Sequence, residues 1–152
     1  MKIRGFEVVS SEHRKHSTVD IQLPVRSTQD SAGYDFYLPV DTVIKPQETV
    51  VVFSDVKSYM QPNEVLMLFV RSSIGIKKNI VLANGTGIID ADYYSNPSND
   101  GNIGLALFNQ SNKTVELKAG ERVAQGIFVP FLVADNGNTN NVRQGGTGST
   151  NN

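Results

Sequence analysis

The segment EVLMLFV at residues 64–70 is a nearly continuous apolar run that follows the turn signal at 61–63. A strand that is apolar on both faces is typical of one buried between two layers. Helical periodicity is weak, and only residues 72–77 have the pattern of a turn or two of helix. Short β-rich runs bounded by turn residues recur at 5–10, 34–40, 49–53, 80–83, 86–90, 102–108, 115–117 and 122–131. The pattern predicts an all-β fold of the sandwich, barrel or jelly-roll type.

The composition excludes several function classes. The chain has 152 residues, enough for one domain with a substantial core, and it has no Cys and two His, His13 and His16. A disulfide framework, a thiol nucleophile and a Cys-ligated zinc site are excluded, and no metal-ligating cluster is predicted. The net charge of −1, with dispersed basic residues, argues against a nucleic-acid partner. No membrane-length apolar stretch or signal peptide is present, so we expect a soluble, cytoplasmic protein.

The C-terminal segment differs in composition from the rest of the chain. Residues 135–152 are dominated by Asn, Gly, Thr and Ser, with Val142 as their only aliphatic residue. We therefore predict a folded catalytic domain at 1–134 and a flexible Gly/Asn-rich arm at 135–152. By composition alone the arm is a frayed terminus. However, RQGGTGST at 143–150 combines an Arg with bare backbone amides and hydroxyls, the groups that wrap phosphate.

Two carboxylates and a turn lie close together in the sequence. Asp90 ends the apolar run at 87–89, and Asp92 follows two residues later, so an extended chain would place both on one face. They are either catalytic groups or turn-forming residues at a strand end. The dipeptide Asn84-Gly85 separates two short apolar runs and predicts a β-hairpin.

Several other polar residues interrupt or directly follow apolar stretches of the sequence. Arg71-Ser72-Ser73 directly follows the apolar run at 64–70, where it is either an anion site or a strand terminus. Gln125 shares a strand face with apolar residues, which fits either a buried partner or an edge position facing water. Asp35, between two aromatics, would ordinarily be a cap or turn group.

Five motifs in order resemble those of the trimeric dUTPase family: AGYDF (32–36), RSSIG (71–75), NGTGIIDADY (84–93), GERVAQ (120–125) and RQGGTGST (143–150). The resemblance implies a distorted jelly-roll or β-barrel protomer of a homotrimer whose C-terminal arm is exchanged between subunits. Each active site would combine motifs from three chains. The implied activity is hydrolysis of dUTP to dUMP and pyrophosphate, which supplies dUMP and keeps uracil out of DNA.

The resemblance also implies roles for the residues that bind the nucleoside. Asp90 matches the base that activates the attacking water. Tyr93 matches the aromatic residue that packs on deoxyribose and leaves no space for a 2′-hydroxyl. Asn84, Gly87 and Ile89 match the uracil pocket, where backbone groups imitate a base-pairing edge.

The remaining matches lie on the phosphate side. Ser72 matches the hydroxyl near the α/β bridging oxygen, where charge develops on the leaving group. Magnesium would be carried mainly by the triphosphate, and Asp35 would be either an outer-shell partner or a structural anchor. The other phosphate contacts implied by the match are Arg71, Ser73 and Gln125, with Arg143, Gly148 and Ser149 on the closing arm.

The sequence departs from the family pattern at three places. Thr147 occupies the position at which the family has a Phe that stacks on uracil. Without that ring, one of the two surfaces that would enclose the base is missing. The segment Tyr94–Gly101 is longer than the usual turn and predicts an inserted loop beside the sugar. Ser73 stands where Gly is common, and this change should be tolerated.

Two other functions compete with dUTP hydrolysis. dCTP deaminase has a similar fold and Arg-Ser-Ser motif, but its chemistry relies on a Glu in the third-motif segment, and residues 80–101 contain none. Some phage members of the family resemble signalling proteins that bind a repressor through inserted loops. The loop Tyr94–Gly101 would be the surface for such a regulatory protein partner, although nothing in the sequence identifies one.

Overall fold

The computed structural model describes residues 1–146, so the predictions for Thr147, Gly148 and Ser149 lie outside the described residues. Two 3₁₀ turns, η1 (Ser11–His13) and η3 (Ala91–Tyr93), and one π-helical turn, η2 (Ser73–Lys77), accompany the strands. The strands are β1 (Gly5–Val8), β2 (Val25–Arg26), β3 (Tyr34–Tyr37), β4 (Thr42–Ile44), β5 (Thr49–Phe53), β6 (Val56–Tyr59), β7 (Glu64–Val70), β8 (Ile80–Leu82), β9 (Gly87–Asp90), β10 (Gly104–Asn109), β11 (Val115–Leu117) and β12 (Arg122–Pro130).

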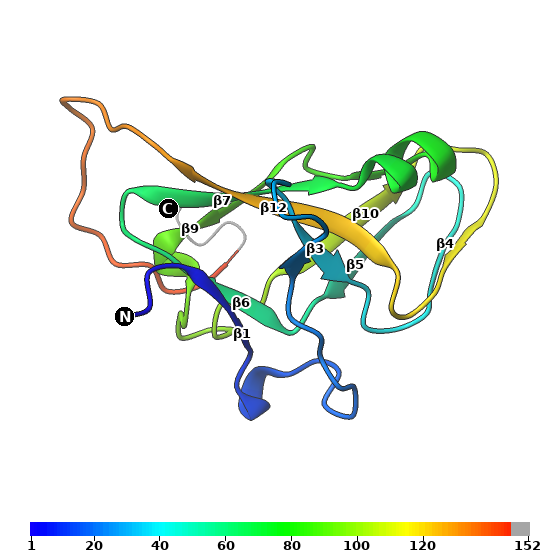
Figure 1. Ribbon diagram of the computed structural model, residues 1–152, viewed down its shortest axis with the longest axis horizontal. Coiled ribbons are helices and arrows are strands. Elements are labelled where there is room, and N and C mark those ends of the chain that lie inside the picture. Colours follow the sequence, from blue (N-terminus) through cyan, green and yellow to red (C-terminus); the bar gives the residue numbers. More distant parts are fainter. Residues whose placement is uncertain (147–152) are drawn as a thin grey trace.

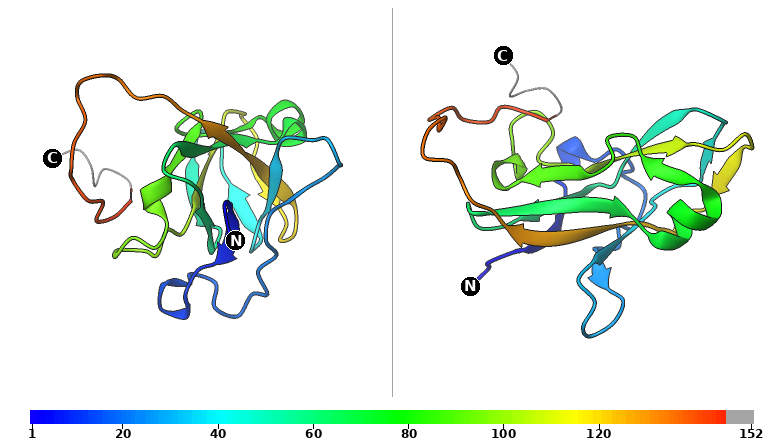
Figure 2. Two further views of the ribbon diagram at one scale, coloured as in Figure 1. Left: turned by 60° about the vertical axis from the view of Figure 1, so that its left-hand side comes forward. Right: turned by 90° about the horizontal axis from the view of Figure 1, so that it is seen from above.

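Two antiparallel sheets enclose the core. One has the strand order β2-β3-β12-β7-β9, the other has the order β5-β10-β8, and the pairs β1-β6 and β4-β11 complete the barrel (Figures 1 and 2). In β7 and β10 buried residues alternate with more exposed ones, the pattern expected where each sheet has one face on the core. The all-β jelly-roll prediction is confirmed. The largest buried side chains are Phe36, Leu38, Ile44, Leu66, Leu68, Ile80, Ile103, Leu105, Leu107 and Leu117.

The strand β7 lies between β12 and β9. Its residues Leu66 and Leu68 are buried in the core, whereas Val65 and Met67 on the other face are only half-buried. The full burial on both faces expected from the apolar run is therefore not reached within one chain. The half-covered outer face continues onto β9, where Ile88 remains 54% exposed.

The predicted hairpin at Asn84-Gly85 is wrong in its pairing. The turn itself forms: Gly85 adopts a φ of 75°, and its N–H donates to the Leu82 carbonyl at 2.9 Å. However, β8 pairs with β10 and β9 pairs with β7, so the turn carries the chain from one sheet to the other. Turn chemistry is local, whereas each strand's partner is chosen by the layer in which its apolar residues are buried.

The segment after β12 leaves the body of the protein and turns back toward η3 (Figures 1 and 2). Residues 131–142 are exposed throughout. No helix among residues 1–146 is both long enough and apolar enough to cross a membrane.

A buried carboxylate joins the N-terminal segment to the barrel. Asp55 is fully buried and accepts hydrogen bonds from the backbone N–H groups of Lys15 and His16 (both 2.8 Å), Arg14 Nε (3.0 Å) and Asn102 Nδ2 (2.8 Å). Burial pushes the pKa of Asp55 upward, but these four donors outweigh burial and hold its pKa below the usual value. The ionised form is therefore the one that the fold stabilises.

The Asp55→Asn variant should test this contribution. Asn suits the left-handed backbone of this residue (φ 59°), so the change removes the charge without adding backbone strain. Leaving Arg14 without its counter-charge should lower the free energy of unfolding at pH 7 by about 3 kcal/mol, measured by urea denaturation. Because the pKa is lowered in the folded state, the wild-type advantage should be complete above about pH 4 and shrink as the pH falls below it.

The exposed Asp20 provides the matched control, since Asp20→Asn should leave the unfolding curve almost unchanged. Equal stability of Asp55→Asn and wild type at pH 7 would contradict the structural role of the buried carboxylate.

Candidate functional site

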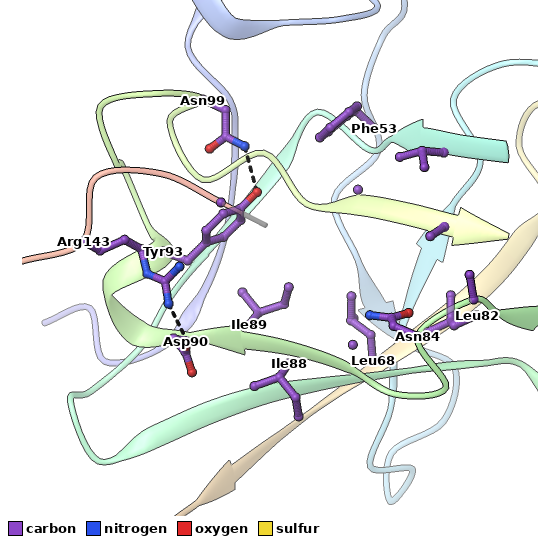
Figure 3. Close-up of a pocket in the computed structure, with 16 residues that line it drawn as sticks. Phe53, Leu68, Leu82, Asn84, Ile88, Ile89, Asp90, Tyr93, Asn99 and Arg143 are labelled. Carbon is purple, nitrogen blue, oxygen red and sulfur yellow. Dashed lines mark hydrogen bonds and ion pairs between the residues drawn. The ribbon is translucent and has the colours of Figure 1, made fainter. Parts of the chain in front are cut away.

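A cavity of about 800 Å³ lies between the strand β9 and the β5–β10 edge of the opposite sheet (Figure 3). In its sheet β9 is the edge strand, so one row of its backbone N–H and C=O groups is not used by a neighbouring strand. The cavity brings together six of the residues predicted from the sequence: Asn84, Gly87, Ile89, Asp90, Tyr93 and Arg143.

Backbone register places the carboxylate and the aromatic ring of this cavity. Asp90 is the last residue of β9 and lies opposite Val65 of β7, after which η3 turns the chain and brings Tyr93 back over the cavity. Gly87 lies against Leu68, where a Cβ atom would approach the Leu68 Cβ to 2.9 Å. Glycine therefore allows the two strands to pack closely at the floor of the cavity.

The arm residue Arg143 joins both carboxylates of the third motif. Its Nη2 lies 2.6 Å from Asp90 Oδ2, its Nε lies 2.7 Å from Asp92 Oδ1, and its guanidinium carbon is 5.9 Å from the centre of the Tyr93 ring. The Arg143 side chain is 11% exposed, whereas that of Asp90 remains 50% exposed. The two carboxylates thus face the same side of the chain, and Asp90 keeps access to solvent.

The Tyr93 hydroxyl is held by two residues that sequence reasoning missed. It donates to the Asn102 carbonyl at 2.5 Å and accepts from Asn99 Nδ2 at 2.8 Å. Burial raises the pKa of the Tyr93 phenol above its usual value, so the neutral form persists at physiological pH. The unusual length of the loop that follows Tyr93, rich in Asn, was the sequence signal that could have pointed to Asn99.

A second polar cluster lies at the far end of β7. The buried Asp35 contacts Arg71 Nε at 3.3 Å and Arg122 Nη1 at 3.4 Å. Gln125 lies opposite Asp35 in the β3–β12 register, and its side chain covers Gly33, where any Cβ atom would clash with Gln125 Oε1. Arg122 was not among the predicted site residues, although it lies inside the fourth motif.

The turn after β7 positions the two serines of the second motif. The Arg71 N–H donates to the Val123 carbonyl at 3.1 Å, and the Arg71 carbonyl accepts from the N–H groups of Ile74 and Gly75, both at 3.0 Å. Ser72 and Ser73 therefore occupy a short turn at the mouth of the core strand, with Ser72 exposed.

The two clusters do not meet within one chain. Asp90 lies opposite Val65, and Arg71 directly follows β7, six residues beyond Val65, a separation of about 20 Å at a rise of about 3.3 Å per residue. The single chain thus presents two separate halves of the predicted site, one with Asp90 and Tyr93 and the other with Arg71 and Gln125. Neither half alone holds all the predicted site residues.

Comparisons with known proteins agree on one family. A family model described as dUTPase matches residues 19–151. The deoxyuridine 5′-triphosphate nucleotidohydrolase of Lactococcus lactis is 45% identical over 99% of each chain. The crystal structure of a dUTPase from Streptococcus mutans, also 45% identical, covers 87% of this chain and 99% of its own with a TM-score of 0.76.

A more distant structure shares the fold. A variant dUTPase from phage phi11 of Staphylococcus aureus, described for its coordination of a structural Mg(II) ion, is 21% identical, with a TM-score of 0.71 over 92% of this chain and 98% of its own. The family match over most of the chain and the high identity of the two bacterial relatives lead to one conclusion: this chain belongs to the dUTPase family.

Proposed function

We propose that the chain hydrolyses dUTP to dUMP and pyrophosphate, with Asp90 as the base that activates the attacking water. The observation that carries this proposal is the single cavity in which the free edge of β9, the Asp90 carboxylate and the Tyr93 ring converge. It combines groups for recognising a base, stacking on a sugar and activating water. The family of the chain supports the same reaction.

The edge of β9 is suited to the uracil base. Backbone N–H and C=O groups of an unpaired edge can imitate a pairing partner, and Asn84 lies at the turn that leads into this edge. The close contact of Gly87 with Leu68 keeps the cavity floor tight. A tight floor would reject a 5-methyl group, and the fixed pattern of donors and acceptors would reject cytosine.

Asp90 is suited to general-base catalysis because its carboxylate is half-exposed and lies at the rim of the cavity. In the single chain Arg143 forms an ion pair with Asp90, which balances the negative charge of the carboxylate. We infer that Arg143 exchanges this contact for the triphosphate when the nucleotide binds, because an Arg guanidinium bonds well to phosphate. Asp90 is then free to hold and deprotonate water.

The second cluster is suited to the triphosphate. Arg71 and Gln125 can supply donors, and the hydroxyls of Ser72 and Ser73, in the turn that follows β7, would stabilise charge that develops on the departing pyrophosphate. The Asp35 carboxylate is engaged with two guanidinium groups, which favours a structural anchor over an outer-shell magnesium partner.

Magnesium fits this arrangement as an ion carried by the substrate. Among residues 1–146 no three His, Asp or Glu side chains gather into a metal site, and a triphosphate-borne ion needs none because phosphate oxygens and water fill its coordination shell. When bound, it would neutralise charge on the triphosphate. Arg71 and Arg143 would share that task from the protein side.

Assembly of several chains would unite the two halves of the site. The separation of about 20 Å between Asp90 and Arg71 is too large for one triphosphate to bridge both from the same chain. The half-covered apolar face around Val65, Met67 and Ile88 offers a surface for a second copy. We infer the homotrimer that the motif resemblance implies, with the arm at 135–152 exchanged between subunits.

Neither alternative function gains support from a specific contact. The loop Tyr94–Gly101 directs its Asn99 side chain at Tyr93, a role within the site, and a regulatory protein partner remains a prediction. Deamination of dCTP would require a Glu in the third-motif segment, and residues 80–101 contain none.

We infer a cytoplasmic location from the absence of Cys and from the nucleotide substrate.

A nucleotide panel tests the proposed reaction. Purified protein with magnesium should release pyrophosphate from dUTP, and release from dTTP, dCTP and UTP should be lower by at least about 100-fold, because each of these analogues lacks or adds a group that the cavity recognises. Omitting magnesium should reduce the rate strongly. Ammonia release from dCTP, or equal turnover of all four nucleotides, would refute the proposal.

The Asp90→Asn variant tests the role of the carboxylate. The amide keeps the size of the side chain but cannot accept a proton from water, so kcat for dUTP should fall by roughly 100-fold or more while the Kd for a non-hydrolysable analogue stays similar. Asp92→Asn serves as the matched control, since it removes the neighbouring charge beside Arg143 and should retain most of the turnover. Near-normal turnover by Asp90→Asn would exclude it as the base.

A further inference from the structure

We propose that Asn99, in the loop Tyr94–Gly101, is a positioning residue that holds the Tyr93 ring in place and thereby maintains selection of deoxyribose over ribose. This inference rests on the proposed function, in which the Tyr93 ring packs on the sugar. The loop Tyr94–Gly101, which is longer than the usual turn of the family, would thus contribute to substrate specificity.

The Tyr93 phenol has one proton, and both of its hydrogen-bonding capacities are used. It donates that proton to the Asn102 carbonyl at 2.5 Å and accepts from Asn99 Nδ2 at 2.8 Å. Figure 3 shows Asn99 beyond the hydroxyl end of the ring, on the side opposite Asp90. The ring is therefore fixed at its Cα by η3 and at its hydroxyl by the loop that follows it.

The orientation of the Asn99 amide is set within the loop. Its Oδ1 accepts from Asn96 Nδ2 at 2.7 Å and from the Gly101 N–H at 3.0 Å, which leaves Nδ2 to face Tyr93. Rotating the amide by 180° would place its NH₂ group against those two donors. Only the observed orientation satisfies all of these groups.

The loop is anchored independently of Asn99. Asp100 accepts from Lys57 Nζ at 2.9 and 3.0 Å and from the Ser10 N–H at 2.8 Å, while the Tyr94 hydroxyl donates to Glu7 at 2.7 Å. The backbone of the loop is thus held to β1 and β6. A change confined to the Asn99 side chain should loosen the Tyr93 ring without releasing the loop.

A fixed ring matters for the choice of sugar. A 2′-hydroxyl can be excluded by contact only if the aromatic surface cannot move aside, since a small displacement of the ring would make room for one oxygen atom. The arm residue Gly146 lies against the same pair, where a Cβ atom would be 3.2 Å from Tyr93 Cε1 and 3.5 Å from Asn99 Nδ2. The Tyr93–Asn99 pair therefore forms one continuous wall of the cavity.

The Asn99→Asp variant removes the hydrogen-bond donor of the amide and keeps its acceptor. Its carboxylate can still accept from Asn96 and Gly101, but it has no hydrogen to donate to Tyr93. The Tyr93 hydroxyl then faces two acceptors with a single proton, so one of its two hydrogen bonds is lost.

We expect the ratio of kcat/KM for dUTP to kcat/KM for UTP to fall roughly three- to ten-fold, the range that corresponds to one net hydrogen bond. The melting temperature should change little. Tyr93→Phe removes both hydrogen bonds without altering the loop and should lower the same ratio, and adding Asn99→Asp to Tyr93→Phe should cause no further loss. Ser98→Ala, which changes a loop hydroxyl directed at Asn96, should leave the ratio unchanged.

The possible outcomes separate this inference from the proposed function. A wild-type protein that turns over UTP as well as dUTP would refute the role of Tyr93 in the proposed function. A selective wild type with an equally selective Asn99→Asp variant would overturn the inference alone. If Asn99→Asp does not fold, unchanged selectivity in Tyr93→Phe would overturn it equally.

Discussion

The antiparallel register of β7 against β9 and β12 is the constraint on which the functional arrangement depends. It places Asp90 opposite Val65 at one end of β7 and Gln125 opposite Phe69 near the other. A shift of either pairing by one residue would turn every side chain of that strand to the opposite face of the sheet. The distance between the Asp90 carboxylate and the cluster of Arg71 and Gln125 is thus set by backbone hydrogen bonds along β7.

A chain of polar contacts links the stability of the barrel to the geometry of the site. The side chain of Asn102 is held by the buried Asp55, while its carbonyl accepts the hydrogen bond from Tyr93. Asn99 completes the restraint on the same hydroxyl. The extended loop after the third motif therefore supports the Tyr93 ring from the protein interior, with contacts that a shorter turn has no residues to supply.

Much of the fold could be predicted because its strands carry strong local signals. The apolar run of β7 and the β-branched run of β5 matched the structure at both ends, whereas β6 was missed because it contains Lys57 and Ser58 and is stabilised by pairing with β1. The turn at Asn84-Gly85 was also predictable, but the divergence of its two strands was not, since strand partners are chosen by non-local burial. Arg122 was missed for a related reason: its partner Asp35 is distant in the sequence.

Mixing two inactive variants tests most directly whether the active site is shared between chains. Arg71→Ala would remove a proposed triphosphate contact from one half of the site and Asp90→Asn the proposed base from the other, so each variant alone should be nearly inactive. After co-expression, random assembly should rebuild roughly a quarter of the sites from one intact half of each chain, with dUTP turnover recovered in proportion. The double variant mixed with either single variant should recover none. If the co-expressed single variants assemble together but stay as inactive as each alone, the account of a shared site is contradicted.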